Sequence, residues 1–141
     1  MQNNSIRKKE ININIDEYTM CPVCGGRASE VHHVVFRSQA PSLIKCELNL
    51  IPLCPNCHDS IHHRGNKKLD RQLKLKFQNK LEYFFIKEYL TKEEINEVLN
   101  ISDKALERLL KTLKKTDDKY YREDVIRACM GNKLILEGDE D

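Results

Sequence analysis

The 141-residue sequence predicts an α+β fold, in which a small zinc-stabilised unit of two strands and one helix precedes a mainly α-helical C-terminal region. Three observations predict it: two C-x-x-C steps, a β-branched run at residues 30–36, and helical apolar periodicity after residue 67. Hydrophobic residues make up only 40% of the chain, charged residues make up 33%, and tryptophan is absent. Because such a composition does not favour a large unaided core, the six cysteines are the first feature to explain.

Four of the six cysteines form two close pairs at the spacing that lets two thiolates bind one Zn²⁺. The N-terminus has no apolar core behind its charges, so we expect no signal peptide and a cytoplasmic protein, in which disulfides are rare. A redox role for the pairs is less favoured, since no thioredoxin-like βαβ pattern surrounds either one. The remaining Cys46 and Cys129 are expected to be buried apolar residues. The predicted ligands of a structural zinc are Cys21, Cys24, Cys54 and Cys57.

The elements of the first half are predicted from local patterns. Residues 1–10 resemble a polar tail, and the alternation of apolar residues at 11–15 predicts a short strand. The β-branched run at 30–36 and the apolar run at 48–53 predict a strand and its return strand. Helical spacing at 55–64 predicts a helix that Gly65 would end.

The second half is predicted to be helical. An apolar stripe over residues 67–90 (Leu69, Leu73, Phe77, Leu81 and Phe85, widened by Phe84 and Ile86) predicts an amphipathic, core-facing helix. Thr91 and Glu94 form a capping-box pattern before a helix that ends at Leu99, and Ser102 precedes a second helix that reaches Leu113. A short extended piece at 119–121 leads into a third helix that ends near Gly131. The expected units are residues 1–17, 18–66, 67–90, 91–133 and an acidic tail at 134–141.

Charge is uneven along the chain. The formal net charge is only +2, but residues 67–90 hold seven basic and three acidic side chains, whereas residues 91–141 hold ten basic and thirteen acidic ones. Attraction to phosphate is therefore expected to centre on the middle stretch, although a solvated lysine face explains the same composition. No apolar run approaches the roughly 18 residues of a membrane span, so a membrane partner is not expected.

All five histidines lie between residues 32 and 63. His58 and His62 are four apart on the predicted helix, so both project from one face. His32 and His33 are adjacent on a strand and point to opposite faces. This pattern predicts a second metal site made by His32, His58 and His62, with His33 beside it as an unliganded imidazole suited to general-base work.

The strings CPVCGG, EVHHVVF and LNLIPLCPNCHDSIHH resemble the zinc-knuckle form of the HNH (ββα-metal) endonucleases over residues 18–66. The resemblance implies that His32 and His58 bind the catalytic metal, that His33 is the general base, and that Asn49 orients the catalytic loop. His62 matches a further metal ligand of some members. Many relatives have aspartate at the position of His32, so the site here is richer in imidazole.

The resemblance implies metal-dependent hydrolysis of a DNA phosphodiester that leaves a 5′-phosphate and a 3′-hydroxyl. One catalytic divalent ion (Mg²⁺, Mn²⁺, Ni²⁺ or Zn²⁺) would act beside the structural Zn²⁺, and imidazole ligands suit Mg²⁺ least. Each chain would cut one strand, so double-strand cleavage would need a homodimer or two events. The candidate DNA contacts near the site are Arg37, Arg64, Lys67 and Lys68.

Residues 90–131 resemble the helix-turn-helix of excisionase-like and MerR-like proteins. If the resemblance holds, the helix after Ser102 reads DNA through outward basic residues such as Lys104, Arg108 and Lys111. The local excess of acidic residues argues against this interpretation. The alternative is a small three-helix bundle that serves packing or protein contact. For the whole chain, the alternative to an endonuclease is a non-catalytic zinc-binding module that binds DNA or regulates, in which His58 could itself complete a Cys₃His site.

Overall fold

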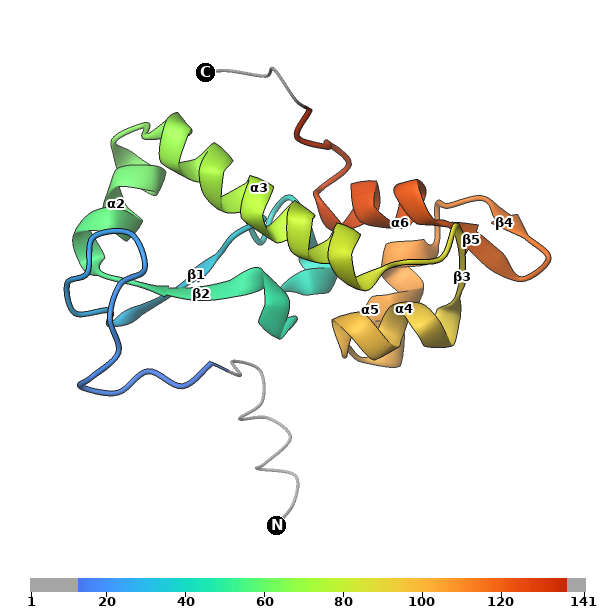
Figure 1. Ribbon diagram of the computed structural model, residues 1–141, viewed down its shortest axis with the longest axis horizontal. Helices are drawn as coiled ribbons and strands as arrows, with labels where there is room; N and C mark the ends of the chain where they lie inside the picture. Colours follow the sequence, from blue (N-terminus) through green and yellow to red (C-terminus); the bar gives the residue numbers. More distant parts are fainter. Residues whose placement is uncertain (1–12, 137–141) are drawn as a thin grey trace, which may run out of the picture.

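The computed structural model describes residues 13–136 and confirms the predicted α+β class. Figure 1 shows an elongated arrangement, with α2 near one end of the long axis and the elements α4, α5 and β4 toward the other. The long helix α3 runs between the two ends, and the β1–β2 pair lies beneath it in that view. The candidate site described below is built where β1 meets α2.

The first sheet consists of β1 (Glu30–His33) and β2 (Leu50–Leu53), which pair antiparallel with Glu30 opposite Leu53 and His33 opposite Leu50. β1 is shorter than predicted, because the chain bends at residues 34 and 35, which bond to Asn49 instead of continuing the strand ladder. β2 begins two residues later than predicted, because the short 3-10 turn η2 (Glu47–Asn49) precedes it. A second 3-10 turn, η1 (Pro41–Leu43), lies in the same connection.

The helix predicted over residues 55–64 is present as α2 (Pro55–His63), which contains the second cysteine of the second pair. Cys54 caps it, since its sulfur accepts a hydrogen bond from the backbone N–H of Cys57. The N-cap geometry therefore places Cys54 and Cys57 on the same side of the helix start. The next helix, α3 (Lys67–Phe84), begins after Asn66, whose side chain accepts from the Leu69 backbone N–H.

α3 ends at Phe84, whereas the sequence predicted a helix to residue 90. Its end is fixed by Arg122, whose guanidinium donates to the backbone carbonyls of Phe85 and Glu82. These carbonyls are among the groups that a helix end leaves without an intrahelical partner. The following residues enter β3 instead, so a distant arginine decides where the helix stops.

The apolar stripe of α3 faces the core as predicted through Leu73, Phe77 and Leu81, and Phe85 just beyond the helix is also buried. The predicted widening of the stripe is wrong, because Phe84 is 47% and Ile86 is 82% exposed. The helix ends before Ile86, so helical spacing no longer decides which way that side chain points.

The C-terminal part begins with the capping box that the sequence predicted, in which Thr91 and Glu94 each accept from the other's backbone N–H. Ser102 caps the second helix as predicted, and that helix ends at Leu110. The three strands of this part form one sheet in the order β3-β5-β4, of which only β5 was predicted. The elements are β3 (Tyr89–Thr91), α4 (Lys92–Leu99), α5 (Asp103–Leu110), β4 (Lys115–Thr116), β5 (Lys119–Tyr121) and α6 (Arg122–Cys129).

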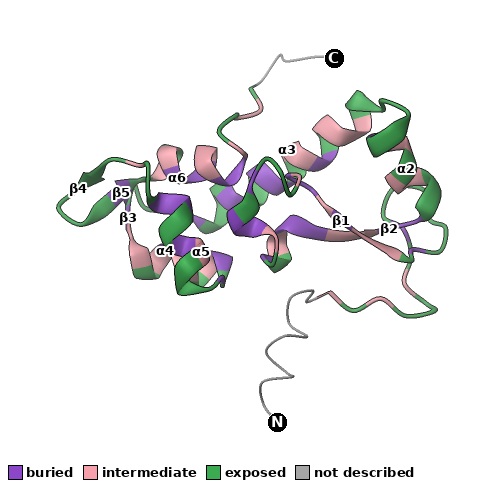
Figure 2. Ribbon diagram, turned by 180° about the vertical axis from the view of Figure 1, so that it is seen from behind, coloured by how far each residue is buried: buried purple, intermediate pink, exposed green. Residues whose placement is uncertain are grey.

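Buried apolar residues of the described chain form one continuous cluster that runs from Cys21 and Cys54 to α6. Figure 2 shows the buried segments concentrated where β1, β2 and α3 meet the C-terminal helices. Cys46, in the β1–β2 connection, is fully buried and its thiol donates to the Leu99 carbonyl at 3.3 Å. Cys129 is also fully buried, and burial raises the pKa of both thiols, so the prediction that these two are buried residues is confirmed.

The segment after α6 also packs on the β1–β2 connection. Gly131 has a φ of +71°, and a Cβ there would lie 3.0 Å from the Cβ of Gln39, so glycine meets both a conformational and a steric requirement. Gln78 of α3 holds the next residues, because its amide exchanges two hydrogen bonds with the Ile135 backbone. The C-terminal segment therefore packs against α3 and the β1–β2 connection.

Some predictions fall at the edges of the described residues. No strand forms at residues 13–15, so the predicted N-terminal strand is wrong there, while residues 11–12 lie outside the described range. The polar tail at 1–10 and the acidic end at 137–141 also lie outside it. Among residues 13–136, no helix combines the length and the apolar character that crossing a bilayer requires.

Candidate functional site

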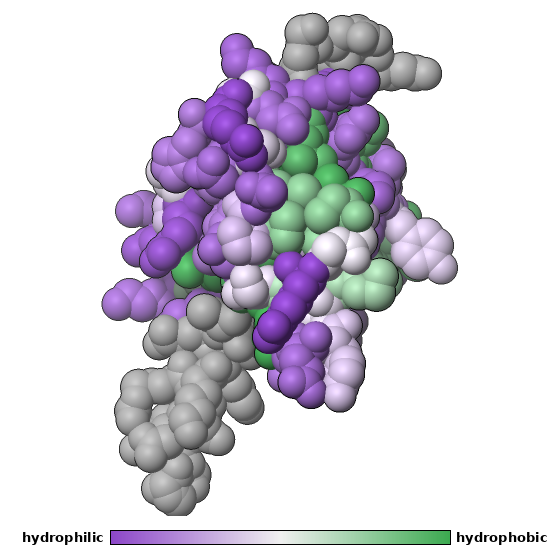
Figure 3. Space-filling model, turned by 90° about the vertical axis from the view of Figure 1, so that its left-hand side faces the viewer, coloured by the Kyte–Doolittle hydropathy of each residue, from purple (hydrophilic) through white to green (hydrophobic). Residues whose placement is uncertain are grey.

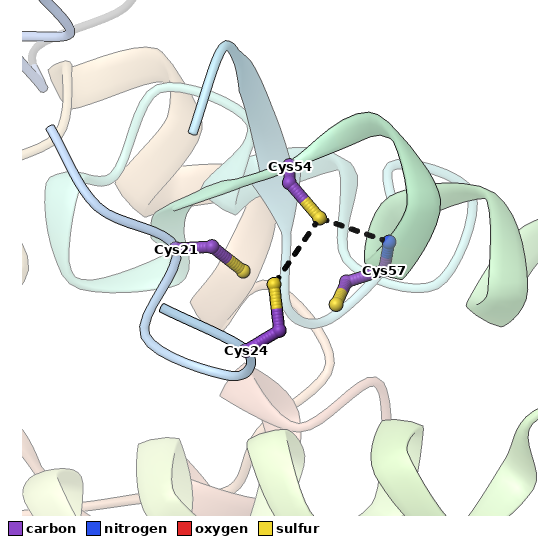
Figure 4. A group of neighbouring side chains, drawn as sticks. All are labelled: Cys21, Cys24, Cys54 and Cys57. Atoms are coloured by element: carbon purple, nitrogen blue, oxygen red, sulfur yellow. Dashed lines mark hydrogen bonds between the residues drawn. The ribbon is translucent and has the colours of Figure 1, made fainter. Parts of the chain in front are cut away.

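Two groups of metal-ligand side chains lie close together in the first half of the chain. The first consists of Cys21, Cys24, Cys54 and Cys57, whose sulfurs all lie within 4.8 Å of one another. Figure 4 shows the four side chains converging from the loop before β1, the end of β2 and the start of α2. The Cys24 and Cys54 sulfurs are 3.6 Å apart. A tetrahedral Zn²⁺ with Zn–S bonds of about 2.3 Å requires sulfurs roughly 3.8 Å apart, so the group fits zinc.

The electrostatics of the cysteine group also favour a cation. Burial alone would raise the pKa of the Cys21 thiol, but backbone N–H groups of Cys54, Cys24 and Val23 outweigh it and lower that pKa to about 6. Burial and the neighbouring sulfurs instead raise the pKa of Cys57 to about 12. Four thiolates therefore repel one another in this space, and a bound divalent cation removes that cost.

The second group consists of His32, His58 and His62, whose ligand nitrogens also lie within 4.8 Å of one another. His32 is fully buried, and neither of its ring nitrogens has a hydrogen-bond partner within the described chain. A buried polar group without a partner is costly, and a metal ion is a partner that the other two imidazoles could share. Burial, followed by the nearby His58 and His62, lowers the pKa of His32 to about 3, so the ring is neutral and has a lone pair to offer.

Glu30 orients one of these ligands. Its carboxylate Oε1 accepts a hydrogen bond of 2.6 Å from Nδ1 of His58, which leaves Nε2 of that ring turned to the cluster. Metal-binding histidines commonly have such a carboxylate partner. The sequence reasoning missed Glu30, although its place two residues before His32 on β1 puts both side chains on the same strand face.

His33 lies on the other strand face and outside the cluster, as predicted. Its Nε2 is 3.0 Å from the Ile44 carbonyl, and because a carbonyl only accepts, Nε2 carries the proton and Nδ1 keeps a lone pair. Burial lowers the pKa of His33, the Ile44 carbonyl opposes that shift, and the charges of Arg37 and His58 add to the lowering. The ring is therefore neutral and held in one orientation, as a proton acceptor requires.

Asn49 holds the connection between the two strands. It is fully buried, its Oδ1 accepts from the Val35 N–H at 2.8 Å, and its Nδ2 donates to the carbonyls of Val35 and Leu43. The Asn49 amide thus ties the chain after β1 to the chain before β2. Ile44, which anchors His33, follows Leu43 directly, so this amide indirectly fixes the position of His33.

The sequence also did not predict that residues of α3 lie near the histidine group. Lys74 lies with Nζ 4.2 Å from the centre of the Phe36 ring and 3.0 Å from Oδ2 of Asp70. The Phe36 ring in turn packs on His62 at a centroid distance of 4.9 Å. The other carboxylate oxygen of Asp70 is buried with no hydrogen-bond partner in the described chain, and the Asp70 charge acts on His62. Only the folded contact between α2 and α3 brings these residues to the histidines.

The predicted DNA contacts lie at two places. Arg37, Lys67 and Lys68 are exposed near the histidine end of the chain, and Arg37 is close enough to influence His33. Arg64 is engaged within its own segment, because it donates to the Asn56 carbonyl at 3.0 Å and its Nε lies 3.3 Å from Asp59. Lys104 and Arg108 are exposed on α5, away from the metal groups.

The histidine cluster opens to solvent on the α2 side. A surface hollow of about 560 Å³ is lined there by residues that include Glu30, His58 and His62. Figure 3 views this end of the molecule and shows a hydrophobic area framed by hydrophilic side chains. Met20 and Val23 are exposed beside the first cysteine pair. The hollow therefore makes His58 and His62, but not the buried His32, accessible from solvent.

Two antiparallel strands and a helix that carry a four-cysteine group and a three-histidine group define a metal-binding ββα unit. The family model described as HNH endonuclease matches residues 21–64, about a third of the chain. The predicted resemblance to this family is thus confirmed for this segment. Neither a curated protein nor a solved structure gave a match to the chain. Nothing in these comparisons supports the helix-turn-helix resemblance of residues 90–131, which stays a prediction.

Proposed function

We propose that the protein is a metal-dependent endonuclease that hydrolyses phosphodiester bonds of DNA. The observation that carries the proposal is the fully buried His32, whose ring nitrogens have no hydrogen-bond partner among residues 13–136. It is placed between His58 and His62 and is next in sequence to an anchored, neutral His33. The family match to residues 21–64 supports the class of reaction. We assign His32, His58 and His62 to a catalytic metal and the four paired cysteines to a structural Zn²⁺.

In the proposed reaction His33 acts as the general base. Its Nδ1 takes a proton from a water molecule, the water oxygen bonds to phosphorus, and the bond from phosphorus to the 3′ oxygen breaks. The leaving 3′ oxygen takes a proton from solvent, which gives a 5′-phosphate and a 3′-hydroxyl. A divalent cation held by the three imidazoles would polarise the phosphate and stabilise the leaving oxygen. Ile44 and Asn49 keep the base in place throughout.

Exposed basic residues near the site are proposed to hold the DNA backbone. Arg37 is the best placed, because its charge already acts on His33. Lys67 and Lys68 are exposed at the start of α3 and can meet neighbouring phosphates. Arg64 would first have to leave Asp59, so we expect it to contribute least. Since the described residues hold one three-histidine group, cleavage of both strands would need two protomers or two sequential events.

The proposal is tested by cleavage of supercoiled plasmid with zinc-loaded protein and added Mg²⁺, Mn²⁺, Ni²⁺ or additional Zn²⁺. Replacing His33 by alanine should slow cleavage by about 10²- to 10⁴-fold, because a positioned general base contributes that much. The zinc content should not change, since His33 touches neither metal group.

The matched control is His63→Ala, on the same helix as two of the ligands. His63 is exposed and its Nδ1 bonds to Asp59, outside the three-histidine group. This variant should cleave at the rate of the wild-type protein. Cleavage by purified His33→Ala at an undiminished rate would remove the assigned base, and a wild-type protein that cuts under none of the four metals would instead favour the non-catalytic zinc module.

A further inference from the structure

A surface groove follows one side of α5 and begins at the β1–β2 connection. Its first section, of about 250 Å³, lies between the β1–β2 connection and the start of α5. One wall comes from the β1–β2 connection and the other from α5 and the residues just before it. The lining residues are Pro41, Ser42, Ile44 and Lys45 on one side and Ile101, Ser102, Lys104, Ala105 and Arg108 on the other.

The groove continues along α5 into a second section of about 480 Å³. Lys104 and Arg108 line both sections, so the two adjoin at these side chains. These side chains lie one helical turn apart and project from the same face of the helix. The second section adds Lys92, Glu107, Leu110, Lys111 and Tyr120. We call the two sections together the α5 groove.

The α5 groove is strongly basic, although the C-terminal region as a whole is acidic. Five of its lining residues are cationic (Lys45, Lys92, Lys104, Arg108 and Lys111), and the single carboxylate is Glu107. Glu107 is 3.9 Å from the Lys92 ammonium. On the neighbouring face of α4 and α5, an adjoining hollow shares Lys92 and Glu107 with the groove, and its other charged residues are Glu93, Glu97 and Asp103. Apart from the two shared residues, the basic side chains line the α5 groove and the acidic ones line the neighbouring hollow.

The near end of the groove is tied to the candidate base. Ile44 lines the groove, and its backbone carbonyl accepts the hydrogen bond from Nε2 of His33. A strand whose scissile phosphate reaches His33 therefore needs little further length to enter the groove. Figure 1 shows β1 running along the molecule from the α2 end toward α5, in the direction that such a strand would take.

We propose that the α5 groove binds the sugar–phosphate backbone of duplex DNA beyond the scissile phosphate. This inference rests on the endonuclease function proposed above. Lysine and arginine side chains neutralise phosphates, while apolar walls such as Ile44, Ile101 and Ala105 suit the sugar faces. The binding is independent of DNA sequence for two reasons. The start of α5 faces η1, and the basic residues line a groove of the protein instead of standing out from it as those of a base-reading helix would.

The test measures binding of a fluorescently labelled DNA duplex by anisotropy, over a range of salt concentrations. The protein is the full chain with structural zinc, in a His33→Ala background so that cleavage does not interfere. We compare Lys104→Ala/Arg108→Ala with Lys80→Ala/Lys133→Ala, which removes the same charge from exposed positions outside the groove. Both double variants should keep the zinc content and the unfolding temperature, since all four side chains are exposed.

The groove variant should bind about tenfold to a hundredfold more weakly at low salt. Its plot of log affinity against log salt should lose about 1.8 units of slope, because each phosphate contact contributes about 0.9. The losses should be equal for two duplexes of unrelated sequence, and the control variant should show neither. Unchanged affinity and slope would overturn the proposal, and so would a loss confined to one sequence, because that indicates base reading. Plasmid cleavage by the wild-type protein tests the endonuclease function separately.

Discussion

Replacing Glu30 tests whether its hydrogen bond to His58 orients that ring for metal binding at the three-histidine group. We consider Glu30→Gln, which keeps the size of the side chain and one oxygen acceptor but removes the charge. The bond is short, at 2.6 Å, and joins an imidazole N–H to a carboxylate. Such charge-assisted bonds are roughly twice as strong as neutral ones.

The expected magnitude follows from the position of the pair. Loss of a carboxylate partner to a metal-binding histidine reduces metal affinity by about 10- to 100-fold. The Glu30 side chain is 44% exposed and the His58 side chain 23% exposed, so solvent screens part of the interaction. We therefore expect about tenfold weaker metal binding for Glu30→Gln and a loss nearer to a hundredfold for Glu30→Ala, which also removes the acceptor.

The assay is calorimetric titration of Ni²⁺ into protein that already holds its structural zinc. Asp59→Asn is the matched control, because Asp59 makes the same kind of bond to His63 at 2.8 Å, yet His63 lies outside the three-histidine group. The control should bind Ni²⁺ as the wild-type protein does. Equal affinities for wild type and Glu30→Ala would refute the reasoning, since His58 would then need no orientation by Glu30.

Two further predictions concern stability. Asn49→Ala leaves three buried backbone groups without their partner, so urea denaturation should show a loss of about 3 kcal/mol of unfolding free energy, whereas Asn79→Ala on the exposed face of α3 should change it by less than about 0.5 kcal/mol. Cys57→Ser should reduce bound zinc to well below one equivalent and lower the thermal unfolding midpoint, because zinc binding is coupled to folding. A variant that keeps full zinc and an unchanged midpoint would show that Cys57 is not a ligand.

The parts of the site that the sequence predicted are those set by short-range spacing. A C-x-x-C step brings two sulfurs together wherever the chain folds, and residues four apart on a helix share a face. The cysteine quartet and the His58–His62 pair therefore needed no tertiary information beyond the pairing of β1 with β2. His32 and His33 followed from strand alternation in the same way.

The parts that the sequence did not predict depend on contacts between distant segments. Asp70 and Lys74 reach the histidines only because α3 packs beside α2. The end of α3 depends on Arg122, some forty residues away, and β3 exists because β5 pairs with it. Three-residue strands carry too little pattern to be distinguished from loops. Glu30 is different, since strand alternation would have placed it beside His32.

The packing of Cys46 on Leu99 and of Gly131 on Gln39 limits how the chain can be shortened. The family match ends at residue 64, yet the connection that holds Ile44 and Asn49 is walled by α5 and by the residues after α6. A fragment trimmed to the matched segment would lose the contact of Cys46 with Leu99 and the packing of α5 on the β1–β2 connection. Because the buried core runs without a break into the C-terminal helices, we expect the smallest piece that folds on its own to be nearly the whole described chain.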